Sequence, residues 1–165
     1  MKINLLAVTL CLVGASATAQ TCGDAETPCE IESGTYHVLA PEGEPRGAVV
    51  MLHGGGGRAS GLLGSGIAKQ AIERGFVFIA PQGFQEGQRF ERNWAVRADN
   101  FTPPHDDIGF LNDVMDKVAS DYGAPRGSML IAGFSRGGSM AWDVACYAPE
   151  TARAYAPAAL SLIHI

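Results

Sequence analysis

Residues 131–140 read IAGFSRGGSM, and this stretch decides the fold. An apolar run typical of a buried strand leads into Gly133-Phe134-Ser135-Arg136-Gly137, and an apolar helical pattern follows. The pentapeptide matches G-x-S-x-G, in which a sharp strand-to-helix turn exposes the serine hydroxyl at the carboxyl end of the strand. The pattern predicts Ser135 as a nucleophile, with Gly133 and Gly137 allowing close backbone approach. The alternative is a tight turn that carries an ordinary serine.

A second glycine-rich stretch, His53-Gly54-Gly55-Gly56-Gly57, follows an earlier apolar run. A serine that attacks an ester creates a tetrahedral oxyanion, which needs two N–H donors. We expect one donor to be the backbone amide of Arg136. The other is expected from Gly55 or Gly56, because a residue without a side chain lets its backbone approach the substrate. His53 is interpreted as a structural residue that braces this loop.

Strands and helices alternate along the sequence. Apolar runs predict buried strands at 48–53, 76–80 and 128–132, and helical periodicity predicts helices at 60–74, 106–122 and 136–147. The stretch GTYHVLAPEGEPRG predicts an edge strand and a turn. This order favours an α/β fold with a mostly parallel sheet and helices on both faces. Residues 82–105 have little regular pattern, and a connection of this length is often functional.

Composition and charge argue against several classes of function. The net charge is -5 and the basic residues are dispersed, so no surface suited to nucleic acid is expected. Residues 54–59 also fit the dinucleotide pattern G-x-G-x-x-A, which would make the protein an oxidoreductase. The next predicted strand ends in Ala80-Pro81-Gln82, however, without the acidic residue that such a site requires. We therefore expect no cofactor and no metal ion.

The first nineteen residues have the three parts of a signal peptide. Lys2 supplies a positive charge, residues 3–13 are mainly apolar, and Ala17-Thr18-Ala19 offers small residues for cleavage before Gln20. The apolar run is too short for a membrane anchor. We predict export, to the periplasm or outside the cell.

Export makes the cysteines informative. Cys22 and Cys29 lie close together in a polar stretch, and in an oxidising compartment they are expected to form a disulfide. A metal site is the rival interpretation, but no further ligands cluster with them. Cys146 falls in an apolar helical stretch and is expected to be a buried thiol or half of a second bridge.

Five stretches, taken in order, resemble a known family: LHGGGG, FIAPQG, RNWAV, DDIGFLNDVM and GFSRGGSMAWDVACYAPE. They are similar to secreted esterases of the polyhydroxybutyrate depolymerase and feruloyl esterase family, the LpqC-like group. The resemblance covers nearly all of the chain from residue 20 to about Ala159. It implies an α/β-hydrolase fold, a Ser-His-Asp triad, and ester substrates such as polyhydroxyalkanoate oligomers or feruloylated and acetylated plant polysaccharide.

The acid and the histidine of that triad should follow the serine in sequence. Only Asp143, Glu150 and His164 do so, and Asp143 lies two turns along the serine's own helix, pointing away from it. His164 belongs to residues 160–165, LSLIHI, which depart from the family pattern and are interpreted as a sequencing or assembly artefact. We therefore expect residues 20–159 to be the N-terminal part of an α/β-hydrolase domain whose C-terminal part is missing. The triad acid and histidine stay unknown.

Several alternatives are left open. His105 with Asp106 or Asp107 could complete a triad in another order, although carboxylates at a helix start more commonly act as caps. A secreted peptidase on the same fold and an inactive binding module are rival functions. Trp94 and Phe101 could stack on a substrate, but local packing is the commoner role of such residues.

Overall fold

The structure is a computed structural model that describes residues 22–85, 92–97 and 105–159. In sequence order its strands and helices are β1 (Cys29–Ile31), β2 (Gly34–Leu39), β3 (Ala48–Leu52), the 3-10 helix η1 (Ala59–Leu62), α1 (Gly66–Glu73), β4 (Val77–Pro81), β5 (Phe84–Gln85), β6 (Arg92–Asn93), α2 (Asp107–Tyr122), the 3-10 helix η3 (Arg126–Ser128), β7 (Met129–Phe134), α3 (Arg136–Tyr147), the 3-10 helix η4 (Pro149–Thr151) and β8 (Ala154–Ala158).

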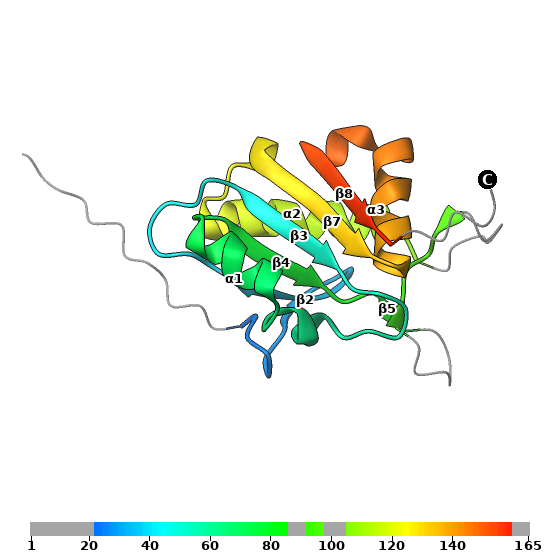
Figure 1. The fold of residues 1–165 in the computed structure, drawn as a ribbon, viewed down its shortest axis with the longest axis horizontal. Helices are drawn as coiled ribbons and strands as arrows, with labels where there is room; N and C mark the ends of the chain where they lie inside the picture. The colour runs from blue at the N-terminus through cyan, green and yellow to red at the C-terminus, as the bar shows by residue number, and fades with distance from the viewer. Residues whose placement is uncertain (1–21, 86–91, 98–104, 160–165) are drawn as a thin grey trace, which may run out of the picture.

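Six strands form one sheet in the order β1-β2-β4-β3-β7-β8. The four strands β4, β3, β7 and β8 are parallel, whereas β1 and β2 are antiparallel to their neighbours. The parallel strands therefore end at the same edge of the sheet, to the right in Figure 1. A mostly parallel sheet is confirmed. Strand β5 pairs with β6 in a separate two-stranded sheet.

Helices cover both faces of the large sheet, α1 on one side and α2 and α3 on the other (Figure 1). The alternation of side chains along β4 explains this arrangement. Val77 and Ile79 join the core with α2 and α3, whereas Phe78 and Ala80 join a smaller core under α1. A strand buried on both faces is continuously apolar, which is why the sequence of β4 lacks the alternation of a half-exposed strand.

The strands and helices differ from the predictions in three respects. The helix expected over 60–74 is divided into η1 and α1, because the Ser65 hydroxyl accepts a hydrogen bond from the Ala68 N–H and starts a new helix. Strand β2 lies inside the sheet, between β1 and β4, so its assignment to an edge was wrong. Strands β1, β5, β6 and β8 were not predicted. Strand β1 has only three residues, β5 and β6 have two each, and β8 consists of alanine, tyrosine and proline.

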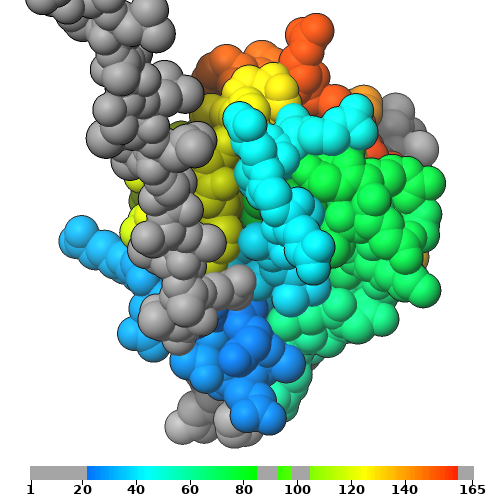
Figure 2. Space-filling model, turned by 90° about the vertical axis from the view of Figure 1, so that its left-hand side faces the viewer, coloured from blue at the N-terminus to red at the C-terminus, as the bar shows by residue number. Residues whose placement is uncertain are grey.

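The amino ends of the parallel strands form the opposite end of the molecule, which faces the viewer in Figure 2. There the segment leading into β3 lies between the end of α1 and the start of β7. The Arg46 N–H donates to the carbonyl of Gly75 (2.8 Å), and a Cβ on Gly47 would lie 2.0 Å from the carbonyl oxygen of Ser128. At the amino ends of the strands these segments therefore pack backbone against backbone. The polar side chains around Ser135 and the glycine loop lie at the carboxyl ends.

The face of the sheet beside α1 is only partly covered. An open, apolar groove of about 1230 Å³ runs along it, with Val49, Ile67, Phe76, Leu130 and Ala132 in its lining. The alanines at 154, 156 and 158 of β8 are exposed. Within the described residues, β8 is the last strand on its side of the sheet.

The N-terminal part of the described residues is held to the sheet by a disulfide between Cys22 and Cys29, as predicted. The Val38 N–H donates to the Gly23 carbonyl (2.9 Å), which joins this loop to β2. Cys146 is exposed rather than buried, because Met140, Ala141 and Val144 occupy the buried face of α3. Among the described residues it is a free thiol. None of the helices described is long and apolar enough to span a membrane.

Tyr36 of β2 is 1% exposed, and burial, together with the negative charge of Asp121, raises the pKa of its phenol to about 12. The unfolded protein releases this proton near pH 10 and the folded protein near pH 12, so stability falls as the pH rises through that interval. Between pH 9 and pH 11.5 we expect the free energy of unfolding to fall by about 2 kcal/mol less in Tyr36→Phe than in the wild type, because the variant has no phenol at this position. Urea unfolding at pH 9 and 11.5 measures it, with Tyr147→Phe, at an exposed tyrosine, as the control.

Candidate active site

Ser135 lies between β7 and α3 with a backbone conformation of φ 53° and ψ −119°. A non-glycine residue at this φ is strained by on the order of 1–3 kcal/mol, so the surrounding structure must impose it. The Ser135 N–H donates to the Ala158 carbonyl (3.0 Å) of the neighbouring strand β8, which contributes to that restraint. Its side chain is exposed and makes no capping hydrogen bond to the first turn of α3. The turn therefore presents a hydroxyl that the helix does not use.

Glycines allow the backbones around Ser135 to touch. A Cβ on Gly137 would lie 2.3 Å from the Leu52 carbonyl oxygen, and one on Gly133 would lie 2.1 Å from the Gly137 carbonyl oxygen. The sequence analysis predicted this close backbone approach at both glycines. Gly138 is a third such position, because its Cβ would lie 2.5 Å from the Ala158 carbonyl oxygen.

The tetraglycine loop that follows β3 lies beside this turn. A Cβ built on Gly54 would be 3.6 Å from the Ser135 Cβ, and one built on Gly55 would be 3.7 Å from the Arg136 Cβ. Arg136 is the first residue of α3, so its backbone N–H lies at the positive end of the helix dipole. The structure thus brings together the serine and the segments from which both oxyanion donors are predicted. A Cβ on Gly56 has no heavy atom within 4 Å, which places this residue on the open side of the loop.

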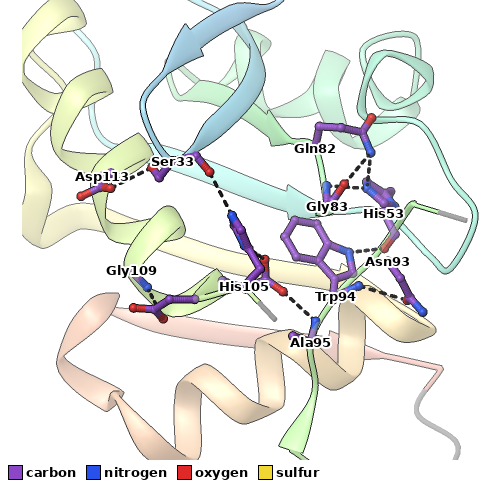
Figure 3. Close-up of polar contacts among 12 residues, drawn as sticks. Ser33, His53, Gln82, Gly83, Asn93, Trp94, Ala95, His105, Gly109 and Asp113 are labelled. Carbon is purple, nitrogen blue, oxygen red and sulfur yellow. Dashed lines mark hydrogen bonds and ion pairs between the residues drawn. The ribbon is translucent and has the colours of Figure 1, made fainter. Parts of the chain in front are cut away.

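His53 is buried at the root of the loop, 3% exposed. Its Nε2 accepts the Gly83 N–H at 2.9 Å (Figure 3). Its Nδ1 lies 2.7 Å from the Gly54 carbonyl oxygen. The side-chain amide of Gln82 also lies 2.9 Å from Nε2. Both ring nitrogens are engaged with the loop and with the segment after β4, which agrees with a bracing role.

Residues 93–97 connect the serine turn to the glycine loop. The indole N–H of Trp94 donates to the His53 carbonyl (2.9 Å; Figure 3). The Arg136 Nε–H donates to the Trp94 carbonyl (3.0 Å). Trp94 is 1% exposed and belongs to the main core, so it packs locally and does not line a substrate site. Asn93 precedes it, and its Oδ1 lies 3.7 Å from where a Cβ on Gly55 would be.

Two buried carboxylates hold this segment from the other side. Asp107 of α2 accepts the Ala95 N–H (2.6 Å), and Asp143 of α3 accepts the Arg97 N–H. Burial raises the pKa of Asp107, although the hydrogen bond from Ala95 opposes that effect. Asp106, by contrast, caps α2 by accepting the Gly109 N–H at 3.0 Å. The expectation of helix capping is therefore right for Asp106 and wrong for Asp107, whose carboxylate turns inward.

His105 is also engaged away from the serine. Its Nε2 lies 3.1 Å from the Ser33 carbonyl oxygen (Figure 3). Its Nδ1 lies 2.8 Å from Asp107 Oδ1, and its ring stacks on Phe84. This arrangement joins α2 to the turn between β1 and β2. It gives no support to a triad built from His105 with Asp106 or Asp107.

The three histidines of the described residues all have partners other than Ser135. His37 contacts the Asp24 carbonyl through its Nδ1, and His53 and His105 are engaged as above. Of the residues after Ser135, Asp143 is buried against Arg97 and Glu150 is exposed in η4. His164 and Phe101 lie outside the described residues, as do residues 1–19 and 160–165. No cluster of His, Cys, Asp or Glu in the described ranges could hold a metal ion.

Three contributors to the site were missed in the sequence. Gln82 contacts His53, Asn93 lies beside Gly55, and Asp143 anchors residue 97. The available signal for Gln82 was its place directly after an apolar strand, at the same sheet edge as His53 and Ser135. Asn93 and Asp143 gave no such signal, because their neighbours come from distant parts of the sequence.

Comparison with solved structures shows which fold this is. An acetyl xylan esterase from Aspergillus awamori superposes with a TM-score of 0.60 at 23% identity, over 73% of this chain and 44% of the esterase. Fluorophosphonate-binding serine hydrolase F of Staphylococcus aureus, in a substrate-bound structure, gives 0.63 at 17% identity, over 81% of this chain and 55% of the hydrolase. The protein has a partial α/β-hydrolase fold. A Bacillus cereus carboxylesterase superposes with a TM-score of 0.54 at 17% identity, over 73% of this chain and 57% of the carboxylesterase.

In sequence, the protein is similar to a probable feruloyl esterase C of Aspergillus niger. The two are 32% identical over 78 residues, which is 47% of this chain and 24% of the esterase. No family model matches the sequence. The protein thus spans about a quarter of this curated relative and about half of the solved structures that it resembles. These relatives are named as ester or serine hydrolases.

The close approach at Gly137 predicts a severe effect of adding one methyl group. We expect Gly137→Ala to lower the free energy of unfolding by about 2 kcal/mol or more, because the new Cβ would meet the backbone of β3. The matched control is Gly66→Ala at the start of α1, where nothing lies within 4 Å and the change should be neutral or slightly stabilising. Equal urea midpoints for the two variants would contradict the role given to Gly137.

Proposed function

We propose that this protein is the nucleophile-bearing part of a serine ester hydrolase, with Ser135 as the nucleophile. The observation that carries the proposal is the strained, exposed Ser135 beside the tetraglycine loop. Hydrolysis begins when Ser135 Oγ attacks the carbonyl carbon of an ester and the carbonyl oxygen becomes an oxyanion. The amides of Arg136 and of Gly55, or alternatively Gly56, stabilise that charge.

The reaction then needs a group that moves protons. A histidine takes the Ser135 proton, passes it to the departing alcohol, and later activates the water that cleaves the acyl-enzyme. An acid orients that histidine. We infer that both are supplied by residues beyond Ala159 in a longer parent protein. Support comes from the engaged ring nitrogens of the described histidines, from the uncovered groove beside α1, and from the edge of β8 that no described strand pairs.

The substrates we propose are esters of carboxylic acids with carbohydrate or polyester alcohols. A feruloyl esterase is the relative in sequence and an acetyl xylan esterase is a neighbour in structure. Feruloyl or acetyl esters of plant polysaccharide are therefore the first class to test. Polyhydroxyalkanoate esters are the second, and they rest on the sequence resemblance alone. No cofactor enters this chemistry.

We further propose that the protein works outside the cytoplasm. The disulfide between Cys22 and Cys29 is typical of an oxidising compartment. The apolar N-terminal segment followed by Ala17-Thr18-Ala19 supports export by a signal peptide. Mass spectrometry of the mature N-terminus after expression in a secreting host tests cleavage before Gln20.

Covalent labelling tests the nucleophile in the longer parent. We expect a fluorophosphonate probe to label Ser135, and Ser135→Ala to abolish labelling, because only an activated serine attacks phosphorus at a useful rate. Ser139→Ala, one turn further along α3, is the matched control and should label normally. Labelling that survives Ser135→Ala would defeat the assignment, and an unlabelled parent would favour a binding module. Turnover of ester against amide substrates separates an esterase from a peptidase.

Turnover by residues 20–165 alone tests the missing proton acceptor. We expect them to hydrolyse p-nitrophenyl acetate at no more than about one thousandth of the parent's rate, since removing one member of a triad costs 10³-fold or more. Initial rates beside a Ser135→Ala control give the answer. Rates near those of the parent that depend on Ser135 would show that these residues hold a complete triad.

A further inference from the structure

We propose that Gln82 and His53 act together as positioning residues that set the direction of the Gly55 N–H. The proposal rests on the function assigned above, because it concerns one of the two predicted oxyanion donors. It does not require Gln82 or His53 to touch the substrate. Three features carry it: the identity of the protonated nitrogen of His53, the contacts of the Gly54 carbonyl, and the two contacts of the Gln82 amide.

The contacts of His53 specify which ring nitrogen carries the proton. A carbonyl oxygen only accepts, so Nδ1, at 2.7 Å from the Gly54 oxygen, must be the protonated nitrogen. A backbone N–H only donates, so Nε2, at 2.9 Å from the Gly83 nitrogen, must be the bare one. A proton on Nε2 would face the donors of both Gly83 and Gln82. His53 is therefore neutral, with its proton on Nδ1.

This proton helps to orient the first peptide of the loop. The Gly54 carbonyl accepts from His53 Nδ1 and also from the Gly57 N–H (2.9 Å), so it is held toward the imidazole. In a trans peptide the next N–H points the opposite way from the carbonyl, and the described residues include no cis peptide. The Gly55 N–H is consequently directed away from His53. Gly55 lies beside Arg136, the residue of the other predicted donor.

Gln82 holds both ends of the loop at once. Its Oε1 accepts the Ala59 N–H (3.0 Å), a contact that fixes which end of the side-chain amide is oxygen. Its Nε2 must then be the group that faces His53 Nε2 at 2.9 Å (Figure 3). The loop between residues 53 and 59 is rich in glycine and flexible by composition. Gln82 hydrogen-bonds to residues at both ends of this loop, and these two contacts restrict the motion of the loop.

The hydrogen bond that Gln82 donates to His53 can be tested separately from the one that it accepts from Ala59. Gln82→Glu keeps an oxygen for Ala59 but replaces the N–H donor with a negative oxygen, which favours a proton on His53 Nε2. Gln82→Met removes both contacts at similar size. Gln70→Glu, on the exposed face of α1, makes the same chemical change away from the site and is the matched control.

The experiment is ¹⁵N NMR of the histidine rings, together with amide hydrogen exchange, on the protein without substrate. In the wild type we expect His53 to show a protonated Nδ1 and a bare Nε2. In Gln82→Glu we expect a protonated Nε2 and exchange about three- to tenfold faster at the Gly83 amide, whose acceptor is lost, with Ala59 unchanged. In Gln82→Met we expect the faster exchange at Ala59. Gln70→Glu should change neither amide.

A wild-type His53 protonated on Nε2 would overturn the proposal. So would a Gln82→Glu variant whose His53 and Gly83 signals match the wild type, since Gln82 would then only fill space. If that variant does not fold, the proposal is still tested by the ring signals of the wild type and by the exchange rate of the Ala59 amide in Gln82→Met. None of these measurements needs a reactive Ser135. A failure of the esterase proposal therefore leaves this test intact, and the reverse also holds.

Discussion

The contact on which the rest of the site depends is the approach of α3 to the end of β3. Gly137 leaves no room for a side chain between the helix and the carbonyls of Leu52 and His53. This approach places the first turn of α3 against the strand that carries the glycine loop. The strained backbone of Ser135 is then imposed by its neighbours on both sides, β7 and α3, and by the hydrogen bond to β8. A serine turn and a glycine loop distant in sequence thereby become one surface.

The same end of the molecule is stabilised by side chains that bind backbone groups. Trp94 binds the His53 carbonyl, and Asp107 and Asp143 bind the N–H groups of residues 95 and 97. An irregular segment has no strand partner for its polar groups, so buried side chains must satisfy them. Three elements, α2, α3 and the root of the glycine loop, are consequently joined through one short segment. A displacement of any one of these elements would therefore shift the other two through this segment.

The sequence predicts the frame well and the site only partly. The strands β3, β4 and β7 and the helices α2 and α3 follow from apolar periodicity, and the G-x-S-x-G pattern with the His53–Gly57 loop indicates where they converge. Local signals of this kind report on neighbours along the sequence. The inward turn of Asp107, the exposure of Cys146 and the pairing of Gln82 with His53 depend on which elements pack together. Strand β8 was missed because alanine and proline have little strand propensity, and its place is set by pairing with β7.

The exposed alanines of β8, and its edge left open among the described strands, also bear on how the protein behaves at high concentration. An open strand edge offers backbone donors and acceptors to any other extended segment, including a second copy of the same protein. The adjoining apolar groove adds surface that water solvates poorly. The edge and the groove, as the described residues present them, therefore favour self-association at high concentration. Handling the protein dilute, or at a pH far from its isoelectric point of about 5.3, counteracts that tendency.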